Sequence, residues 1–199
     1  MKKLSPVTVM VFGGLAIAIN VILGDAVALL KIPMLFLDTL GTIFMGVAFG
    51  PFYGALTGLA TNLLMGVTAS PTAIPFGLVN MAVGIICGFM GRRGFGIPKA
   101  IITGLVLSAV APLIGTPIRI LLFGGLTGSG ADLMISALRA AGQQIFASTF
   151  IGVVVSNFID KIASCILVAL VLIPLAPHFK PNTHSVKQPE SLEKPLLNP

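Results

Sequence analysis

Four ionisable residues of this sequence stand within or beside long apolar runs, where a charge is costly and needs a partner. Asp160 and Lys161 are adjacent in the middle of one run, Arg119 lies near the end of another, and Asp38 lies near the start of a third. Charged side chains in apolar helices usually pair with one another or serve a functional site. These residues are therefore the first candidates for contact with a bound solute.

Helix geometry suggests how these charges pair. Successive residues of a helix point about 100 degrees apart, so we expect Asp160 and Lys161 not to pair with each other. Arg119 is the expected partner of Asp160, and Asp38 is the expected partner of Lys161. Two interpretations stay open for the last helix: a structural ion pair that locks it to the bundle, and direct contact with a substrate.

Asparagines form a second candidate group. They lie one in each of four apolar runs, at Asn20, Asn62, Asn80 and Asn157. Because an amide both donates and accepts hydrogen bonds, a ring of them suits a neutral, heteroatom-rich solute such as a vitamin or a nucleobase. The alternative for any single asparagine is a hydrogen bond between helices. We expect some of the four to line a cavity.

The residue types that usually carry catalysis or bind metals are not arranged for either role. His178 and His184 fall in the polar C-terminal stretch, and Cys87 and Cys165 lie in apolar runs without metal-ligand spacing. The sequence has no Gly-x-x-x-x-Gly-Lys-Ser/Thr phosphate loop. We therefore expect no catalytic residue, no metal and no cofactor, and a protein that is not an enzyme.

Membrane helices are the elements that must position these side chains. Of the 199 residues, 56% are hydrophobic and 9% are charged, and the mean hydropathy is +1.05. A soluble domain with a hydrated surface does not support such values, so the chain belongs in a lipid bilayer. The formal net charge of +6 does not indicate a nucleic-acid partner, because the basic residues are dispersed at the ends of apolar segments.

An all-α, six-helix membrane bundle is predicted, because each span needs about 20 mainly apolar residues. The expected helices cover residues 7–23, 34–50, 52–67, 72–90, 98–123 and 145–174. Within 124–144, residues 131–144 have an amphipathic pattern, typical of a helix at the membrane surface or over a cavity mouth. Residues 1–177 are expected to form the transmembrane substrate-binding domain, and residues 178–199 a disordered cytoplasmic tail.

Lysines and arginines predict the orientation, because cytoplasmic loops carry an excess of both. With a cytoplasmic N-terminus and six spans, the outside receives chiefly Lys31 and Arg139. The cytoplasmic side then receives Lys2, Lys3, Arg92, Arg93, Lys99 and the lysines of the tail. Both termini are therefore predicted to be cytoplasmic.

Small residues spaced four apart recur in the apolar runs, where they let helix backbones approach closely. The pairs are Gly14 and Ala18, Gly46 and Gly50, Gly54 and Gly58, and Gly84 and Gly88. Packing inside the bundle is one interpretation of each pair, and a face for a partner protein is the other.

The segment from Phe36 to Gly58 reads FLDTLGTIFMGVAFGPFYGALTG. It resembles the second and third helices of substrate-binding (S) components of energy-coupling factor transporters, in which a Gly-Pro-x-x-Gly-Ala turn joins the two helices. The small-residue face that follows ends in Asn62, and the pair Asp160 and Lys161 in the last helix is also similar to several members of this family.

This resemblance implies a multi-pass protein of a prokaryotic cell membrane that binds a vitamin or related micronutrient. The site would lie at outward-facing loops and the fourth to sixth helices, with residues 124–144 as a lid. Gly14 and Ala18 on the first helix would dock onto a transmembrane coupling protein, itself bound to two ATPase subunits. Uptake would follow when the S component topples in the bilayer.

Two rival functions stay open. A small secondary transporter would use Asp38 and Asp160 as proton or cation sites, but it would require an inverted repeat, and none is convincing here. A membrane enzyme or assembly protein is the other rival. The enzyme should carry acidic or histidine residues at the cytoplasmic face, where this sequence has arginines, and the assembly protein would leave the four asparagines unexplained.

Overall fold

In the computed structural model, residues 5–30 and 32–175 are described, and all their regular structure is helical. The elements are α1 (Pro6–Leu29), α2 (Leu40–Phe49), α3 (Pro51–Thr68), the 3-10 helix η1 (Pro71–Phe76), α4 (Gly77–Gly91), α5 (Ile97–Phe123), α6 (Ala131–Ala140) and α7 (Ile145–Leu175). The predicted all-α fold is confirmed for this part of the chain. The predicted tail, residues 178–199, lies outside the described residues.

Polar caps, proline and glycine set several helix ends. Ser5 caps α1, because its side chain accepts a hydrogen bond from the backbone of Thr8 at 3.1 Å. Pro51 begins α3 directly after Gly50, whose φ of +102° makes the sharp turn from α2. Gly124 ends α5 in the left-handed conformation.

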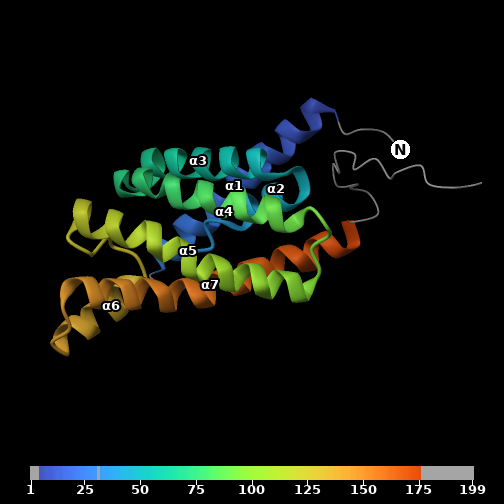
Figure 1. Ribbon diagram of the computed structural model, residues 1–199. Helices are drawn as coiled ribbons and strands as arrows, with labels where there is room; N and C mark the ends of the chain where they lie inside the picture. Colours follow the sequence, from blue (N-terminus) through green and yellow to red (C-terminus); the bar gives the residue numbers. More distant parts are fainter. Residues whose placement is uncertain (1–4, 31, 176–199) are drawn as a thin grey trace, which may run out of the picture.

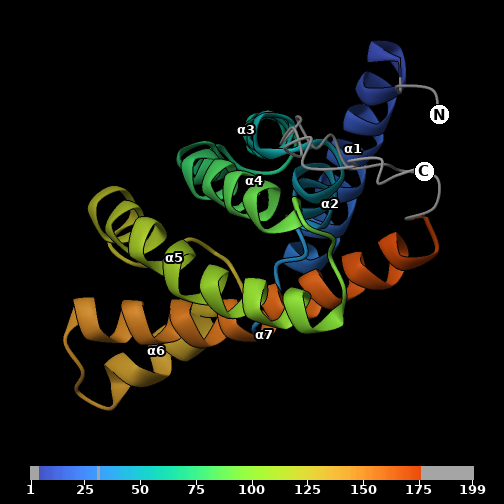
Figure 2. The ribbon, with the colours of Figure 1, turned by 45° about the vertical axis from the view of Figure 1, so that its right-hand side comes forward.

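Two groups of helices make up the bundle. α1 to α4 pack in one group, and α5, α6 and α7 form the other, with α5 and α7 side by side and antiparallel (Figures 1 and 2). The groups meet where α4 contacts α5 and α2 contacts α7. Buried apolar side chains fill this junction, among them Ile43, Val83, Leu107 and Val168. Apolar packing thus holds the two groups of helices together at this junction.

Four segments are long and apolar enough to cross a membrane: α1 with 24 residues, Pro71–Gly91 with 21, α5 with 27 and α7 with 31. Large apolar side chains lie exposed on these segments, including Met10, Leu121 and Val171. The described chain is therefore compatible with a membrane helical bundle. The other two predicted spans are not among the four: α2 has 10 residues, and α3 is diluted by threonines, glycines and Asn62.

The connection between the first two helices differs from the prediction. α1 continues to Leu29 instead of ending at residue 23, because Asp25 faces Thr68 and a cavity within the protein. α2 begins at Leu40 instead of residue 34. Met34 and Leu37 have φ values of +60° and +52°, which a helix cannot contain. Residues 32–39 therefore form an irregular loop.

Glycines in α2, α3 and α4 pack inside the bundle, as one of the two interpretations of the small-residue pairs predicts. A Cβ on Gly84 would lie 2.2 Å from the carbonyl carbon of Gly54, and a Cβ on Gly88 would lie 2.3 Å from the nitrogen of Pro51. Gly14 on α1 differs, since a Cβ there would meet no atom of the described chain within 4 Å. Gly14 and Ala18 are both exposed.

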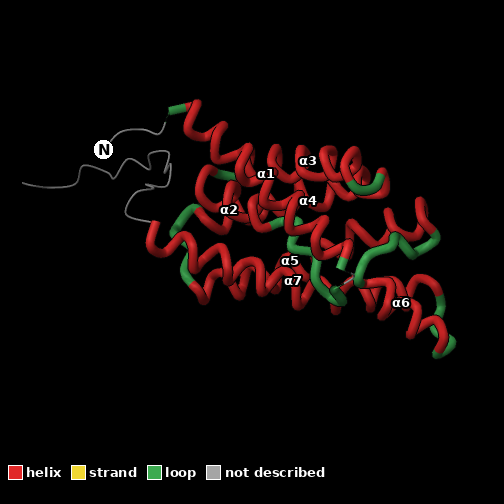
Figure 3. The backbone as a smooth tube through the Cα atoms, turned by 180° about the vertical axis from the view of Figure 1, so that it is seen from behind, coloured by secondary structure: helices red, strands yellow, loops and turns green. Residues whose placement is uncertain are grey.

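The two ends of the bundle differ. α1 begins at the end where α7 finishes, and the turn between α4 and α5 that carries Arg92 and Arg93 lies there too (Figure 3). The C-terminal end of α1, the irregular η1 region and α6 lie toward the opposite end (Figures 1 and 3). Residues that line the cavity described next come from this second end.

Candidate binding site

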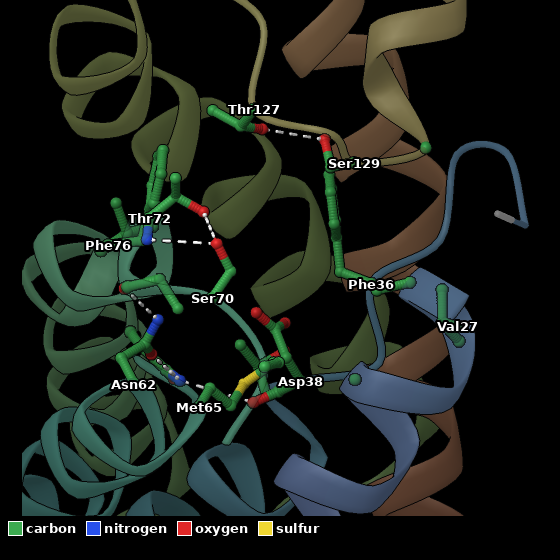
Figure 4. A pocket seen from close by; sticks show the side chains of 18 of the residues that line it. Val27, Phe36, Asp38, Asn62, Met65, Ser70, Thr72, Phe76, Thr127 and Ser129 are labelled. Carbon is green, nitrogen blue, oxygen red and sulfur yellow. Dashed lines mark hydrogen bonds between the residues drawn. The ribbon is translucent and has the colours of Figure 1, made fainter. Parts of the chain in front are cut away.

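A cavity of about 520 Å³ lies between the two groups of helices. Its wall is built by α1, α3, η1, α4, α5 and α7 and by the loops before α2 and α6 (Figure 4). The polar residues of the wall are Asp25, Asp38, Thr39, Asn62, Thr68, Ser70, Thr72, Asn80, Arg119, Thr127, Ser129, Asn157 and Lys161. Apolar surface between them comes from Val27, Leu35, Phe36, Met65, Phe76, Val79 and Val153. This volume and mixture are typical of sites for small organic molecules.

Asp160 holds the irregular loop 32–39 against α7. Its Oδ1 accepts hydrogen bonds from the backbone N–H groups of Phe36 and Leu37, both at 2.9 Å. The side chain is fully buried and is not part of the cavity wall. Because bulky residues with positive φ are strained, these two bonds help to stabilise a backbone that carries Phe36 and Asp38 into the wall.

Lys161 connects α7 to the same loop. Its Nζ lies 2.7 Å from Asp160 Oδ2, 3.0 Å from Thr39 Oγ1 and 3.8 Å from Asp38 Oδ1. The predicted pairing with Asp38 is confirmed, with Asp160 as the closer partner. The prediction that Asp160 and Lys161 do not pair was wrong, because the long lysine side chain reaches back across the angle between neighbouring helix positions.

Asn62 and Asn80 form a linked pair in the cavity wall. Asn80 Nδ2 donates to Asn62 Oδ1 at 2.8 Å, and Asn62 Nδ2 donates to the carbonyl of Ala73 at 3.0 Å. Asn80 Nδ2 also lies 3.4 Å from the carbonyl of Asp38. The pair joins α3, α4, η1 and the loop before α2, so these amides serve both helix packing and the cavity wall.

Arg119 pairs with Asp132, at 2.5 Å from Nη1 to Oδ1, and its Nη2 donates to Ser129 Oγ at 2.8 Å. The prediction that Arg119 pairs with Asp160 was therefore wrong. The backbone bonds of Phe36 and Leu37 already occupy Asp160, while α6 brings Asp132 to Arg119. Asp132 Oδ2 also accepts from the backbone N–H groups of Thr127 and Gly128, at 2.9 and 2.6 Å. These contacts fix the loop 127–130 on the cavity wall.

The structure brings together most of the residues that the sequence singled out. Asp38, Asn62, Asn80, Arg119, Asn157 and Lys161 all line the cavity, and Asp160 lies directly behind it. Asn157 Nδ2 bonds to the carbonyl of Val153 within its own helix. Asn20 lies elsewhere, since its amide bonds to Gly41, Thr42 and Thr61 and joins α1, α2 and α3.

Sequence reasoning missed two acidic residues of this region, Asp25 and Asp132. Asp25 falls between the predicted helices 7–23 and 34–50, and Asp132 falls within the predicted amphipathic segment 131–144, so neither stood out as a site candidate. The rarity of acidic residues could have identified them. The described residues contain four carboxylate side chains in all, Asp25, Asp38, Asp132 and Asp160. Acidic residues that are rare in an apolar chain merit attention as a set.

No protein-family model, curated protein or solved structure matches this chain. The site must therefore be interpreted from its own chemistry. Within residues 5–30 and 32–175, no group of three or more His, Cys, Asp and Glu side chains is placed to hold a metal ion. What the described residues offer is a partly open pocket with apolar walls and hydrogen-bonding groups, which can bind and orient one small organic molecule.

Proposed function

We propose that this protein is the membrane-embedded substrate-binding subunit of an ATP-driven importer of the energy-coupling factor type, for a vitamin or related micronutrient. The observation that carries the proposal is the cavity of about 520 Å³ inside a bundle of apolar helices. A protein that served only as scaffold would gain nothing from a hollow lined by hydrogen-bonding side chains, because unfilled space and unpaired polar groups both destabilise a fold.

The proposal places ATP hydrolysis in partner subunits, because the chain carries no phosphate loop. The chain would bind its substrate alone and require a transmembrane coupling protein with two ATPases for transport. The proposed orientation has six crossings, with α2 and α3 as the two additional ones, and both termini in the cytoplasm of a prokaryotic cell. The end that carries Arg92, Arg93 and Lys99 would then face the cytoplasm, and the cavity would face outward.

α1 is the proposed docking helix for the coupling protein. Gly14 and Ala18 are exposed on it, and the surrounding Met10, Val11 and Leu15 are also exposed. The glycines at 46, 54, 84 and 88, in contrast, contact other helices of the bundle. A small-residue face that the bundle itself leaves open allows close approach of a helix from another protein in the membrane.

Mass spectrometry of molecules that co-purify with the detergent-extracted protein tests the proposal. We expect one small organic compound at near one-to-one occupancy, and its loss from the variant Asn80→Leu. Ser108→Ala is the matched control, because Ser108 lies on α5 outside the cavity wall and its hydroxyl donates to the carbonyl of Leu105 on the same helix. Occupancy should persist in that variant.

Reconstitution into liposomes is a second test, which distinguishes a binding subunit from a secondary transporter. The protein alone should move no solute under a proton gradient, and uptake should require the coupling protein and the ATPases with ATP. An empty purified protein that transports solute alone under a proton gradient would overturn the proposal in favour of a small secondary transporter, with Asp38 as the leading proton site.

A further inference from the structure

The charged groups around the cavity differ in how fully they are paired. Its two cationic residues are occupied: Arg119 by Asp132 and Ser129, and Lys161 by Asp160 and Thr39. The carboxylates of the wall, Asp25 and Asp38, are less fully paired. Asp38 Oδ1 and Asp25 Oδ1 have no hydrogen-bond partner in the described part of the chain. An anionic ligand would have to displace a bonded partner of Arg119 or Lys161. A donor on a cationic ligand can instead approach the Asp38 carboxylate, whose side chain is 26% exposed and which lies 3.8 Å from Lys161 Nζ without a hydrogen bond.

The net charge around the cavity also favours a cationic ligand over an anionic one. Among the described residues, Lys161 faces the two carboxylates of Asp160 and Asp38, so this group of three carries a net negative charge. Arg119 and Asp132 balance each other. Asp25 adds a further carboxylate to the wall, with one long contact of 3.5 Å from the hydroxyl of Thr68. The cavity therefore favours positive charge.

Neutral and aromatic groups complete the wall around Asp38. Asn80 lines the cavity but is 2% exposed, and its Oδ1 is buried beside Gly58 of α3, so this oxygen is not an acceptor for a ligand. Its amide nitrogen is already committed to Asn62. Phe36 and Phe76 add aromatic surface to the wall; Lys161 Nζ already lies 5.8 Å from the centre of the Phe36 ring, and Phe76 stacks on Phe123. Figure 4 shows the Asp38 carboxylate directed into the space between Phe36 and Ser70.

We propose that the substrate is an organic cation whose amine-type nitrogen donates to Asp38, with the Asp25 carboxylate as a second negative charge in the wall. This inference rests on the proposed function and narrows its substrate class. A bare metal ion does not fit, because no metal-binding cluster exists among the described residues. Most of the wall is apolar, so the rest of the molecule is a hydrophobic or aromatic body.

Three matched probes test this assignment by their effect on thermal unfolding of the full chain in detergent: phenylethylammonium, 2-phenylethanol and 3-phenylpropanoate. They share one aromatic body and differ in the charge of the head group. Since a hydrogen bond to a charged group contributes more than a neutral one, the ammonium probe should bind at least about tenfold more tightly than the other two. Asp38→Asn should reduce this preference to near unity, and Asp25→Asn should reduce it partly.

Thr72→Val is the control variant, because it alters the wall without changing charge and Thr72 already shares a hydrogen bond with Ser70. It should keep the preference for the cation. The assignment is overturned if the alcohol or the carboxylate binds as well as the ammonium probe, or if none of the three binds. In the first case the binding-subunit function stands and only the substrate class is wrong. Failure of all three probes together with an empty purified protein rejects both proposals.

Discussion

Asp160 Oδ1 accepts a hydrogen bond at 2.9 Å from the backbone N–H of Leu37, a residue whose φ is +52°. A buried carboxylate in the last helix thus stabilises a strained loop more than 120 positions earlier in the sequence. The same carboxylate holds Lys161 through its other oxygen. The two residues therefore shape the cavity in different ways: Lys161 forms part of the wall, and Asp160 positions the loop that completes it.

Replacement of this carboxylate should destabilise the fold. Asp160→Ala leaves two backbone N–H groups without an acceptor and Lys161 without its closest counterion. Breaking a buried ion pair costs about 3–5 kcal/mol, and we expect a loss of this size in the free energy of unfolding. Thermal unfolding in detergent measures it. Ser164→Ala on the same helix is the control, because the buried Ser164 hydroxyl has no hydrogen-bond partner among the described residues. Equal melting of the two variants would contradict the role given to Asp160.

Loss of the Asp132 carboxylate should loosen the loop on the cavity wall. In Asp132→Ala, the backbone N–H groups of Thr127 and Gly128 lose their acceptor, and Arg119 loses its ion pair. Hydrogen–deuterium exchange at these two amides should become faster. Exchange at the Ala73 amide, which bonds to Ser70 on the far wall, should not change. Unchanged exchange at 127 and 128 would show that other contacts hold this loop.

Two buried asparagines should respond differently to the same substitution. Asn20→Leu leaves Gly41, Thr42 and Thr61 without their partner. Each buried group left unpaired costs about 1–3 kcal/mol, so the protein should be less stable. Its ligand affinity should persist, because Asn20 is not part of the wall. Asn80→Leu should instead abolish ligand binding. Titration of the co-purified compound into both emptied variants measures this, and equal affinities would contradict the assignment.

A bulky residue at position 14 should affect the partner and not the fold. A Cβ on Gly14 meets no atom of residues 5–30 and 32–175 within 4 Å, so Gly14→Leu should unfold at the same temperature as the wild-type protein and bind its ligand normally. It should lose affinity for the coupling protein, because the close helix approach is blocked. Pull-down with the reconstituted coupling complex measures this loss.

Gly54→Leu introduces the same side chain at a position that is packed against other helices. A side chain there would collide with the backbones of Gly46 and Gly84, at 2.7 and 2.9 Å from their Cα atoms. That variant should fail to fold stably. If Gly14→Leu binds the coupling protein as well as the wild type does, another face of the protein carries the docking.

Local physical rules determined much of this fold from the sequence. Apolar runs of sufficient length predicted the helices at 72–90, 98–123 and 145–174, and the structure has helices at Pro71–Gly91, Ile97–Phe123 and Ile145–Leu175. Helices are predictable in this setting because a backbone in an apolar environment must satisfy its hydrogen bonds within the segment. The same reasoning identified the polar residues within apolar runs, and most of them line one cavity.

Tertiary structure decided the partners of those residues. Arg119 pairs with Asp132 and not with Asp160, and Asn20 joins three helices while Asn80 lines the cavity. These outcomes depend on the rotation of each helix and on the path of the loop 32–39. Both are set by close backbone contacts such as that of Gly54 with Gly84 and by the bonds from Asp160. Contacts between residues far apart in the chain form only once the helices are packed, and no local pattern specifies them.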